Sequence, residues 1–172
     1  MNETNAMLLS YIRADVRLMT GYVPGEQPRG EVFIKLNTNE NPYPPSPRVQ
    51  DAITEFVKTD WLRKYPDPVG VAFCKTAGKI LDADPEGILL GNGSDEILTI
   101  LTRTFVSPGG LVVYPYPTYP LYPILAEIHG ARFQAVPFTE SWSLPHPWPM
   151  PQADLTFVAN PNSPSGTVVS LT

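Results

Sequence analysis

The sequence predicts an α/β protein with a mostly parallel sheet flanked by helices. Short runs of β-forming apolar residues alternate along the chain with longer segments whose apolar residues recur at helical spacing. Strands that alternate with helices of this length are typical of parallel sheets. The 172 residues are 42% hydrophobic, which suits roughly one domain of ordinary size with a substantial core.

The first half of the chain begins with a helical pattern from Met7 to Met19. After a short β-rich run, the proline-rich stretch NTNENPYPPSP at 37–47 predicts a loop. Ser46 and Pro47 fit the N-cap and the first-turn proline of the next helix, which the stretch KYPDPVG at 64–70 ends. We expect helices at about 7–19, 46–58, 69–81, 94–106 and 118–130.

The strands predicted between these helices are short and rich in β-branched or aromatic residues. A proline-rich passage at 139–153 predicts surface structure without a regular element, in which Trp142 and Trp148 pack rather than bind a ligand. Gly130 ends the last predicted helix. His129 precedes it at the negative end of the helix dipole, where a cation is favoured, and this place indicates a structural role for His129. We expect strands at about 32–36, 87–90, 111–115, 131–138 and 155–159.

Composition and charge exclude several classes of function. A net charge of −5 argues against electrostatic binding of nucleic acid or of an anionic membrane. The first 22 residues lack the features of a secretory signal, and no segment approaches the about 20 apolar residues of a membrane span, so we expect a cytoplasmic protein. The single cysteine, Cys74, is expected to be buried filler, and two histidines without a paired acidic motif predict no metal site.

The stretch GNGSDE at 91–96 lies between a predicted strand and a predicted helix. A helix start presents unpaired backbone N–H groups and the positive end of the helix dipole, so it can hold a phosphate. Gly91 and Gly93 would let the backbone approach such a ligand closely. The alternative is a plain turn capped by Ser94. The stretch is neither a P-loop nor a G-x-G-x-x-G fingerprint.

Two further loops follow predicted strands. The stretch YPYPTYPLYP at 114–123 crowds four tyrosines with prolines, which could hold a ring against a planar ligand or could simply cover the sheet edge. The stretch NPNSPSGT at 160–167 has asparagines that could orient a ligand or could cap the turn. Because ligands bind at the carboxyl ends of parallel strands, we expect the three loops to converge on one crevice.

The motifs KLNTNENPYPPSP, KYPDP, GNGSDEIL, YPYPTYPLY and NPNSPSGT occur in an order and spacing that resemble the amino-terminal half of histidinol-phosphate aminotransferases. These belong to the fold type I pyridoxal-phosphate enzymes. The resemblance covers nearly the whole chain from about Tyr11. It implies that residues 1–45 form an amino-terminal arm and the first part of the small domain. Residues 46–172 would then be the amino-terminal half of the large cofactor-binding domain.

The resemblance implies a role for several residues in binding the cofactor, pyridoxal 5'-phosphate. The backbone amides of Ser94 and Asp95 match those that hold its phosphate, and Tyr119 matches the tyrosine that stacks on its pyridine ring. Tyr65 matches a tyrosine that crosses the interface of a homodimer to the partner's cofactor phosphate. Two more residues match positions that line the pocket of the small-molecule amino donor and 2-oxo acid, Tyr22 and Asn39.

The chain departs from the family in one turn. The usual motif is N-N-P-T-G, whose second asparagine bonds to the phenolic oxygen of the cofactor, and Ser163 stands at that place. A serine hydroxyl is shorter and can also donate. Either Ser163 serves through a changed geometry, or Asn160 or Asn162 takes the role. Ser165 replaces the usual threonine and keeps the hydroxyl.

The resemblance also implies an absence. In the family the Schiff-base lysine and the acid beside the pyridine nitrogen follow the NPNSPSGT turn, so we expect both beyond Thr172. No lysine of the chain matches the Schiff-base position, and all of them precede the GNGSDE loop: Lys35, Lys58, Lys64, Lys75 and Lys79. We therefore expect an inactive front half of an enzyme, produced by truncation, by a boundary chosen for expression or by a shortened gene.

The expected activity of the whole enzyme is transfer of the amino group between L-histidinol phosphate and 2-oxoglutarate in histidine biosynthesis. A relative that decarboxylates threonine phosphate, or one that acts on aromatic amino acids, fits the same motifs. A non-catalytic fragment that binds a phosphate compound or a protein partner is the alternative from a different class.

Overall fold

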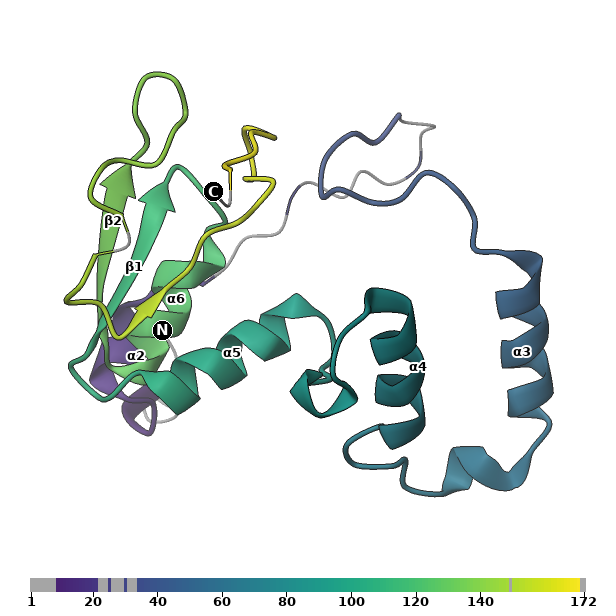
Figure 1. Ribbon diagram of the computed structural model, residues 1–172. Coiled ribbons are helices and arrows are strands. Elements are labelled where there is room, and N and C mark those ends of the chain that lie inside the picture. Colours follow the sequence, from purple (N-terminus) through teal and green to yellow (C-terminus); the bar gives the residue numbers. More distant parts are fainter. Residues whose placement is uncertain (1–8, 22–24, 26–29, 31–33, 149, 171–172) are drawn as a thin grey trace. The chain divides into compact units, whose positions relative to one another are not determined.

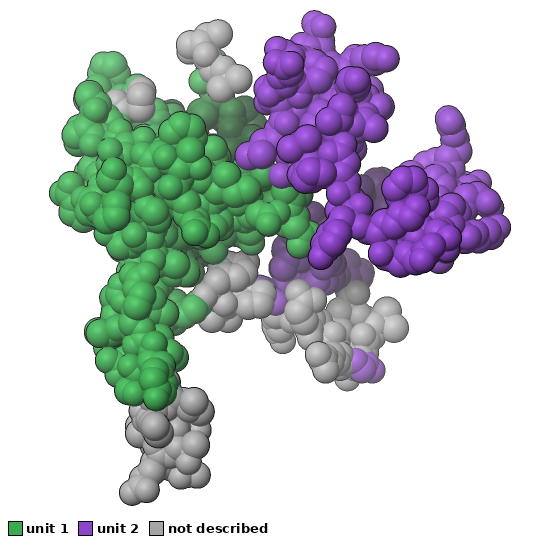
Figure 2. Space-filling view, turned by 90° about the horizontal axis from the view of Figure 1, so that it is seen from below, with its two compact units in different colours: residues 1–22, 91–172 green, residues 23–90 purple. Residues whose placement is uncertain are grey.

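The computed structural model describes residues 9–21, 25, 30, 34–148 and 150–170. The chain forms two compact units (Figures 1 and 2). The first comprises residues 1–22 and 91–172, and the second comprises residues 23–90. Among the helices of the described residues, none has the length and the apolar character needed to cross a membrane.

A parallel three-stranded sheet forms the centre of the first unit. Strand β1 (Leu111–Tyr116) lies between β2 (Arg132–Pro137) and β3 (Leu155–Thr156). In the register of the sheet Val112 of β1 lies opposite Phe133 of β2 and Leu155 of β3. The predicted α/β class with a mostly parallel sheet flanked by helices is therefore confirmed.

Helix α6 (Leu121–His129) packs against β1 and β2 on one face of this sheet, and α5 (Ser94–Phe105) packs against α6 (Figure 1). Val112 and Tyr114 of β1 point to this face and pack against Tyr122 and Ala126 of α6. Alternate residues of a strand point to opposite faces, so β1 contributes every second residue to this core. Burial raises the pKa of the Tyr122 hydroxyl above its ordinary value.

The proline-rich passage between β2 and β3 covers the opposite face of the sheet. Leu111, Val113 and Val136 form a buried cluster there, against which Trp148 and Met150 pack. The passage thus occupies the place that a crossover helix takes in most parallel sheets. The prediction that Trp148 serves packing is confirmed.

The turn before β1 is tightly packed around Gly110. Oδ2 of Asp154 accepts a hydrogen bond from the backbone N–H of Leu111 at 2.6 Å. A Cβ atom on Gly110 would come 2.6 Å from that same oxygen and 2.8 Å from the carbonyl oxygen of Ser107. Only glycine therefore fits this position without a shift of the backbone or of the Asp154 side chain.

The second unit contains α3 (Pro47–Val57), η1 (Asp60–Arg63), α4 (Val71–Leu81) and η2 (Pro85–Gly87). Helix α3 begins at Pro47 with Ser46 at its N-cap, as predicted, although the Ser46 side chain makes no capping hydrogen bond. Cys74 of α4 is buried, and its Sγ lies 3.5 Å from the carbonyl oxygen of Val69, which confirms the prediction of buried filler.

A carboxylate caps the start of α4. Asp67 accepts hydrogen bonds from the backbone N–H groups of Val69 at 3.1 Å and Val71 at 2.8 Å. These bonds, first that from Val69 and then that from Val71, hold the pKa of Asp67 below its ordinary value. The N-cap residue of α4, Gly70, has a φ of 60°, in the left-handed region that glycine tolerates best.

Two predicted strands are wrong and a third is shorter than predicted. Residues 34–36 have no regular structure, and the start of the run predicted at 32–36 lies outside the described residues. At 87–90 the chain leaves η2 with an extended backbone at Ile88, but no strand pairs with it among the described residues. The strand predicted at 155–159 is reduced to β3 because only Leu155 and Thr156 pair with β1.

Candidate functional site

Hydrogen bonds bring together the three loops that were expected to converge. The Tyr119 hydroxyl donates to Oδ1 of Asp95 at 3.0 Å, which links the loop after β1 to the start of α5. The Thr118 hydroxyl donates to Oδ1 of Asn162 at 2.7 Å, which links the same loop to the 160–167 turn after β3. The loops after β1 and β3 therefore meet the start of α5 at the carboxyl end of the sheet, which confirms the predicted convergence, although among the described residues no strand precedes α5.

The start of α5 has the form of an anion site. Gly93 is the N-cap residue, with φ 82° and ψ 176°, and Ser94 is the first helical residue, so the alternative in which Ser94 caps the turn is wrong. The N–H groups of Ser94 and Asp95 lie in the first turn, where a helix offers them no carbonyl partner. Glycine takes the N-cap place because its φ is positive, which a serine adopts rarely.

The two carboxylates of this turn bond to groups other than the N–H groups of Ser94 and Asp95. The Glu96 carboxylate accepts a hydrogen bond from the backbone N–H of Asn92, and the Asp95 carboxylate accepts one from Tyr119. Ser94 and Asp95 are exposed, and a Cβ atom on Gly93 would meet no atom within 4 Å. The space in front of the first turn is therefore open, as far as the described residues show, and its backbone donors can reach a phosphate.

Aromatic neighbours fix the ring of Tyr119. It meets Tyr122 edge to face, with 5.8 Å between the ring centroids, and Tyr122 in turn stacks on Phe157 at 4.8 Å. Tyr119 is half-buried, whereas Tyr116 is exposed. Of the four tyrosines in this stretch, Tyr114 and Tyr122 belong to the core, and Tyr119 is the one whose hydroxyl reaches the start of α5.

The asparagines of the 160–167 turn are bound within the protein. The Asn160 side chain donates to the carbonyl oxygen of Val169 and accepts from its N–H, each at 3.1 Å. Asn162 is buried and bonds to the loop that carries Tyr119. Ser163 is half-buried, and within the described part of the chain its hydroxyl makes no hydrogen bond. Of these three candidate side chains, Ser163 is the one left unpaired in this structure.

The remaining predicted site residues lie apart from these loops in the sequence. Tyr65 and Asn39 belong to the second unit, where Tyr65 is 98% exposed and Asn39 is exposed with a φ of 53°. Tyr22 lies outside the described residues. The roles given to these three residues stay predictions.

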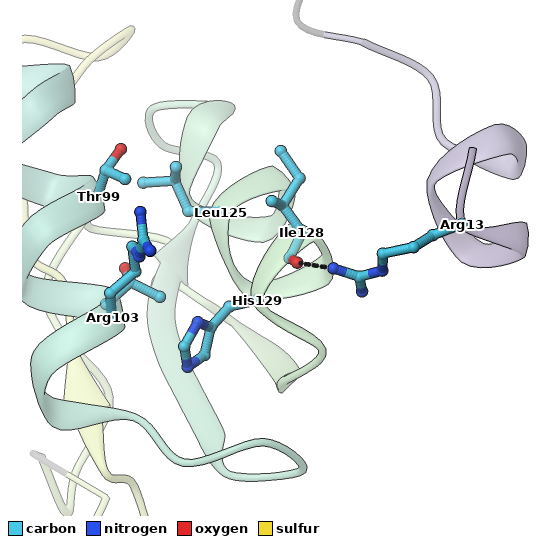
Figure 3. Close-up of a pocket in the computed structure, with 7 residues that line it drawn as sticks. Arg13, Thr99, Arg103, Leu125, Ile128 and His129 are labelled. Atoms are coloured by element: carbon cyan, nitrogen blue, oxygen red, sulfur yellow. Dashed lines mark hydrogen bonds between the residues drawn. The ribbon is translucent and has the colours of Figure 1, made fainter. Parts of the chain in front are cut away.

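A separate pocket of about 340 Å³ lies between α2 (Ala14–Leu18), α5 and α6 (Figure 3). Arg13 donates to the carbonyl oxygen of Ile128 at 3.0 Å, and His129 donates through Nε2 to the carbonyl oxygen of Val106 at 2.6 Å. These two side chains donate to carbonyl groups at the ends of α6 and α5, where a helix leaves its last carbonyl oxygens without partners. The predicted structural role of His129 is confirmed.

Fold and site together define a class of cofactor-dependent enzyme. Residues 31–172 match the family described as aminotransferase class I and II, and the chain belongs to this family. The cofactor of the family is pyridoxal 5'-phosphate. The resemblance to histidinol-phosphate aminotransferases that the motifs indicated is confirmed by the relatives described next.

The chain is 52% identical over 155 residues to a histidinol-phosphate aminotransferase of Rhodopirellula baltica, covering 88% of this chain and 42% of that protein. It is 47% identical over 165 residues to histidinol-phosphate aminotransferase 1 of Trichormus variabilis, covering 94% of this chain and 47% of that protein. The chain thus spans about half the length of the curated relatives that it matches.

Solved structures agree with this assignment. The histidinol-phosphate aminotransferase from Sinorhizobium meliloti, in complex with pyridoxal 5'-phosphate, superposes with a TM-score of 0.64 at 29% identity, covering 74% of this chain and 35% of that one. The apo-BacF structure from Bacillus subtilis superposes with a TM-score of 0.73 and covers 92% of this chain and 44% of that one. At 24% identity the second likeness shows the fold alone.

Proposed function

We propose that this chain carries the phosphate-binding part of an aminotransferase that moves an amino group between L-histidinol phosphate and 2-oxoglutarate in histidine biosynthesis. The observation that carries the proposal is the open first turn of α5, where Ser94 and Asp95 present backbone N–H groups beside the fixed Tyr119. The names of the relatives at 47% and 52% identity support the choice of substrate.

Each residue has a proposed task toward the cofactor. The N–H groups of Ser94 and Asp95 bind its phosphate, because a helix N-terminus favours an anion. Tyr119 presents its ring to the pyridine, and the bond to Asp95 keeps that ring in one orientation. The Ser163 hydroxyl has no partner among the described residues, and it would reach the phenolic oxygen in place of the asparagine usual in the family. Bound pyridoxal phosphate would supply an electron sink when the α-carbon of the amino donor loses its proton.

The proposal leaves the proton transfer itself to residues outside this chain. None of its lysines matches the position that binds the cofactor covalently, and all of them lie in the second unit. We therefore propose that the 172-residue chain alone does not complete the reaction. A homodimer in which Tyr65 reaches the partner's cofactor phosphate, the substrate-pocket roles of Tyr22 and Asn39, the domain boundary after residue 45 and a cytoplasmic location stay predictions.

The first test is a titration of the 172-residue chain with pyridoxal phosphate, followed by absorbance and repeated with inorganic phosphate as competitor. Borohydride reduction and mass analysis then detect any covalent adduct. We expect saturable binding of pyridoxal phosphate that inorganic phosphate inhibits by competition. We expect no covalent adduct at any one lysine. An absence of saturable binding would contradict the proposed phosphate site at the start of α5. A stoichiometric adduct at one lysine would contradict the proposal that no lysine of the chain forms the Schiff base.

The substrate is tested separately. Sequencing the gene beyond codon 172 shows whether the frame supplies an aspartate and a lysine in the family's spacing. The product of that frame is then assayed for glutamate formation from 2-oxoglutarate with three amino donors: L-histidinol phosphate, O-phospho-L-threonine and L-phenylalanine. We expect L-histidinol phosphate to give the highest kcat/KM. A preference for either of the others would replace the proposed substrate.

A further inference from the structure

Asn162 is the most fully bonded polar side chain at the carboxyl end of the sheet. Asn162 is only 4% exposed. Its Oδ1 accepts a hydrogen bond from the Thr118 hydroxyl at 2.7 Å, and its Nδ2 donates to the carbonyl oxygen of Pro117 at 3.1 Å and to the Ser165 hydroxyl at 2.9 Å. A carboxamide is well suited to this place because it offers an acceptor and two donors at once.

The backbone of Asn162 also holds the turn in which it lies. Its N–H donates to the carbonyl oxygen of Thr167 at 2.8 Å, and its own carbonyl oxygen accepts from the N–H of Gly166 at 2.7 Å. The side chain therefore projects from a fixed turn and joins it to a loop 44 and 45 residues away in the sequence. Buried polar groups that are fully paired in this way specify one arrangement of the segments they join.

Thr118 and Asn162 form a junction between the two loops. The residue that follows each of them carries a group that the proposed function assigns to the cofactor. Thr118 directly precedes Tyr119, whose hydroxyl reaches Asp95 at the start of α5. Asn162 directly precedes Ser163, whose hydroxyl is unpaired within the described residues. A continuous series of bonds thus runs from the first turn of α5 through the Tyr119 loop to the 160–167 turn.

We propose that Asn162 is a positioning residue for the cofactor site, which fixes the distance between the ring of Tyr119 and the hydroxyl of Ser163. This inference rests on the proposed function. Asn162 itself does not touch the cofactor, because its carboxamide is already bonded to three protein groups. The alternative that Asn162 replaces the family's asparagine at the phenolic oxygen is thereby set aside.

The test compares Asn162→Asp with wild type in the 172-residue chain. Aspartate keeps the shape and the acceptor toward Thr118, but it places an oxygen opposite the Pro117 carbonyl and removes both donors. Thr118→Val is a milder second variant that breaks the junction from the other side. Thr102→Val is the matched control, because Thr102 is 1% exposed and its hydroxyl donates to the carbonyl oxygen of Leu98 within α5 alone.

Two quantities are measured. The first is the Kd for pyridoxal phosphate, together with the circular dichroism that the bound cofactor acquires from its fixed surroundings. We expect Asn162→Asp to raise this Kd about tenfold or more, which corresponds to ~1.4 kcal/mol, and to diminish the dichroism per bound cofactor. We expect Thr118→Val to change both in the same direction and Thr102→Val to stay within about twofold of wild type.

The second quantity is the rate of backbone hydrogen exchange at Thr118 and Tyr119 in the chain without cofactor. We expect faster exchange there in the Asn162 and Thr118 variants, and unchanged exchange in Thr102→Val. Unchanged exchange at Thr118 and Tyr119, or unaltered Kd and dichroism in both the Asn162 and the Thr118 variant, would overturn the role of Asn162. Failure of wild type to bind pyridoxal phosphate would instead overturn the proposed function, and the exchange measurement would still decide whether Asn162 holds the Tyr119 loop.

Discussion

Replacing Ser94 by proline removes one backbone donor from the start of α5 and leaves the helix intact. Ser94 is the first helical residue, a place where proline is favoured because its N–H would have no partner in the helix. Proline requires an extended ψ in the residue before it, and Gly93 already has a ψ of 176°. The side chain of Ser94 is exposed, so the proline ring meets no packed neighbour.

The expected loss follows from the chemistry of the missing bond. A hydrogen bond to a charged group contributes about 1.5–3 kcal/mol, so Ser94→Pro should raise the Kd for pyridoxal phosphate about 10- to 150-fold. Ser94→Ala keeps the N–H and loses an exposed hydroxyl, so its Kd should stay within about twofold of wild type. The melting temperature of both variants should remain close to that of wild type, because neither change removes a bond within the helix.

The assay is an absorbance titration of each variant with pyridoxal phosphate, with inorganic phosphate as competitor and thermal unfolding followed by circular dichroism. Equal affinity of Ser94→Pro and wild type, in a variant that unfolds at the same temperature, would refute a phosphate bound by this N–H. An equal loss of affinity in Ser94→Pro and Ser94→Ala would refute it as well, because the hydroxyl would then be the binding group.

Three further changes have defined outcomes. Tyr119→Phe keeps the ring but leaves the Asp95 carboxylate unpaired near the phosphate, so the Kd for pyridoxal phosphate should rise about two- to tenfold, and a Kd equal to wild type would contradict this. The pKa of Asp67 is lowered by folding, so its stabilisation is present above its unfolded pKa of about 3.9 and is lost as pH falls through the folded pKa. Asp67→Asn should therefore melt below wild type at neutral pH, and the difference should disappear in acid; a difference that persists there would contradict the linkage. Gly110→Ala should lower the free energy of unfolding by about 1–3 kcal/mol in a denaturant titration, because its Cβ atom would overlap a carboxylate and a carbonyl oxygen; an unchanged midpoint would show that the turn yields.

The helices were predictable because their signals are local. Apolar spacing with caps and prolines placed the ends of four of them within about three residues of those of α3, α4, α5 and α6. Strands depend on partners elsewhere in the chain, and pattern alone could not tell that 87–90 has no described partner. For the same reason the two-residue length of β3 was not predictable, since it is set by the register of β1.

The candidate site likewise has one part that was predictable from local sequence and one part that was not. The backbone donors at the start of α5 follow from a glycine-rich turn before a helical pattern, which is visible in the sequence. The bonds that join the loops are not visible there, because Tyr119 and Asp95 lie 24 residues apart and Thr118 and Asn162 lie 44 apart. No local pattern marks Asn162 as the buried asparagine of its turn, and the resemblance drew attention to its neighbour, Ser163.

The passage that covers the second face of the sheet has prolines at every second position from 145 to 151. Each proline restricts φ while the chain is still unfolded, so less conformational entropy remains to be lost when Trp148 and Met150 settle on the sheet. A crossover helix would gain backbone hydrogen bonds at a larger entropic cost. Part of the stability of this face is therefore a property of the denatured ensemble, and a stability calculation based on folded contacts alone will understate it.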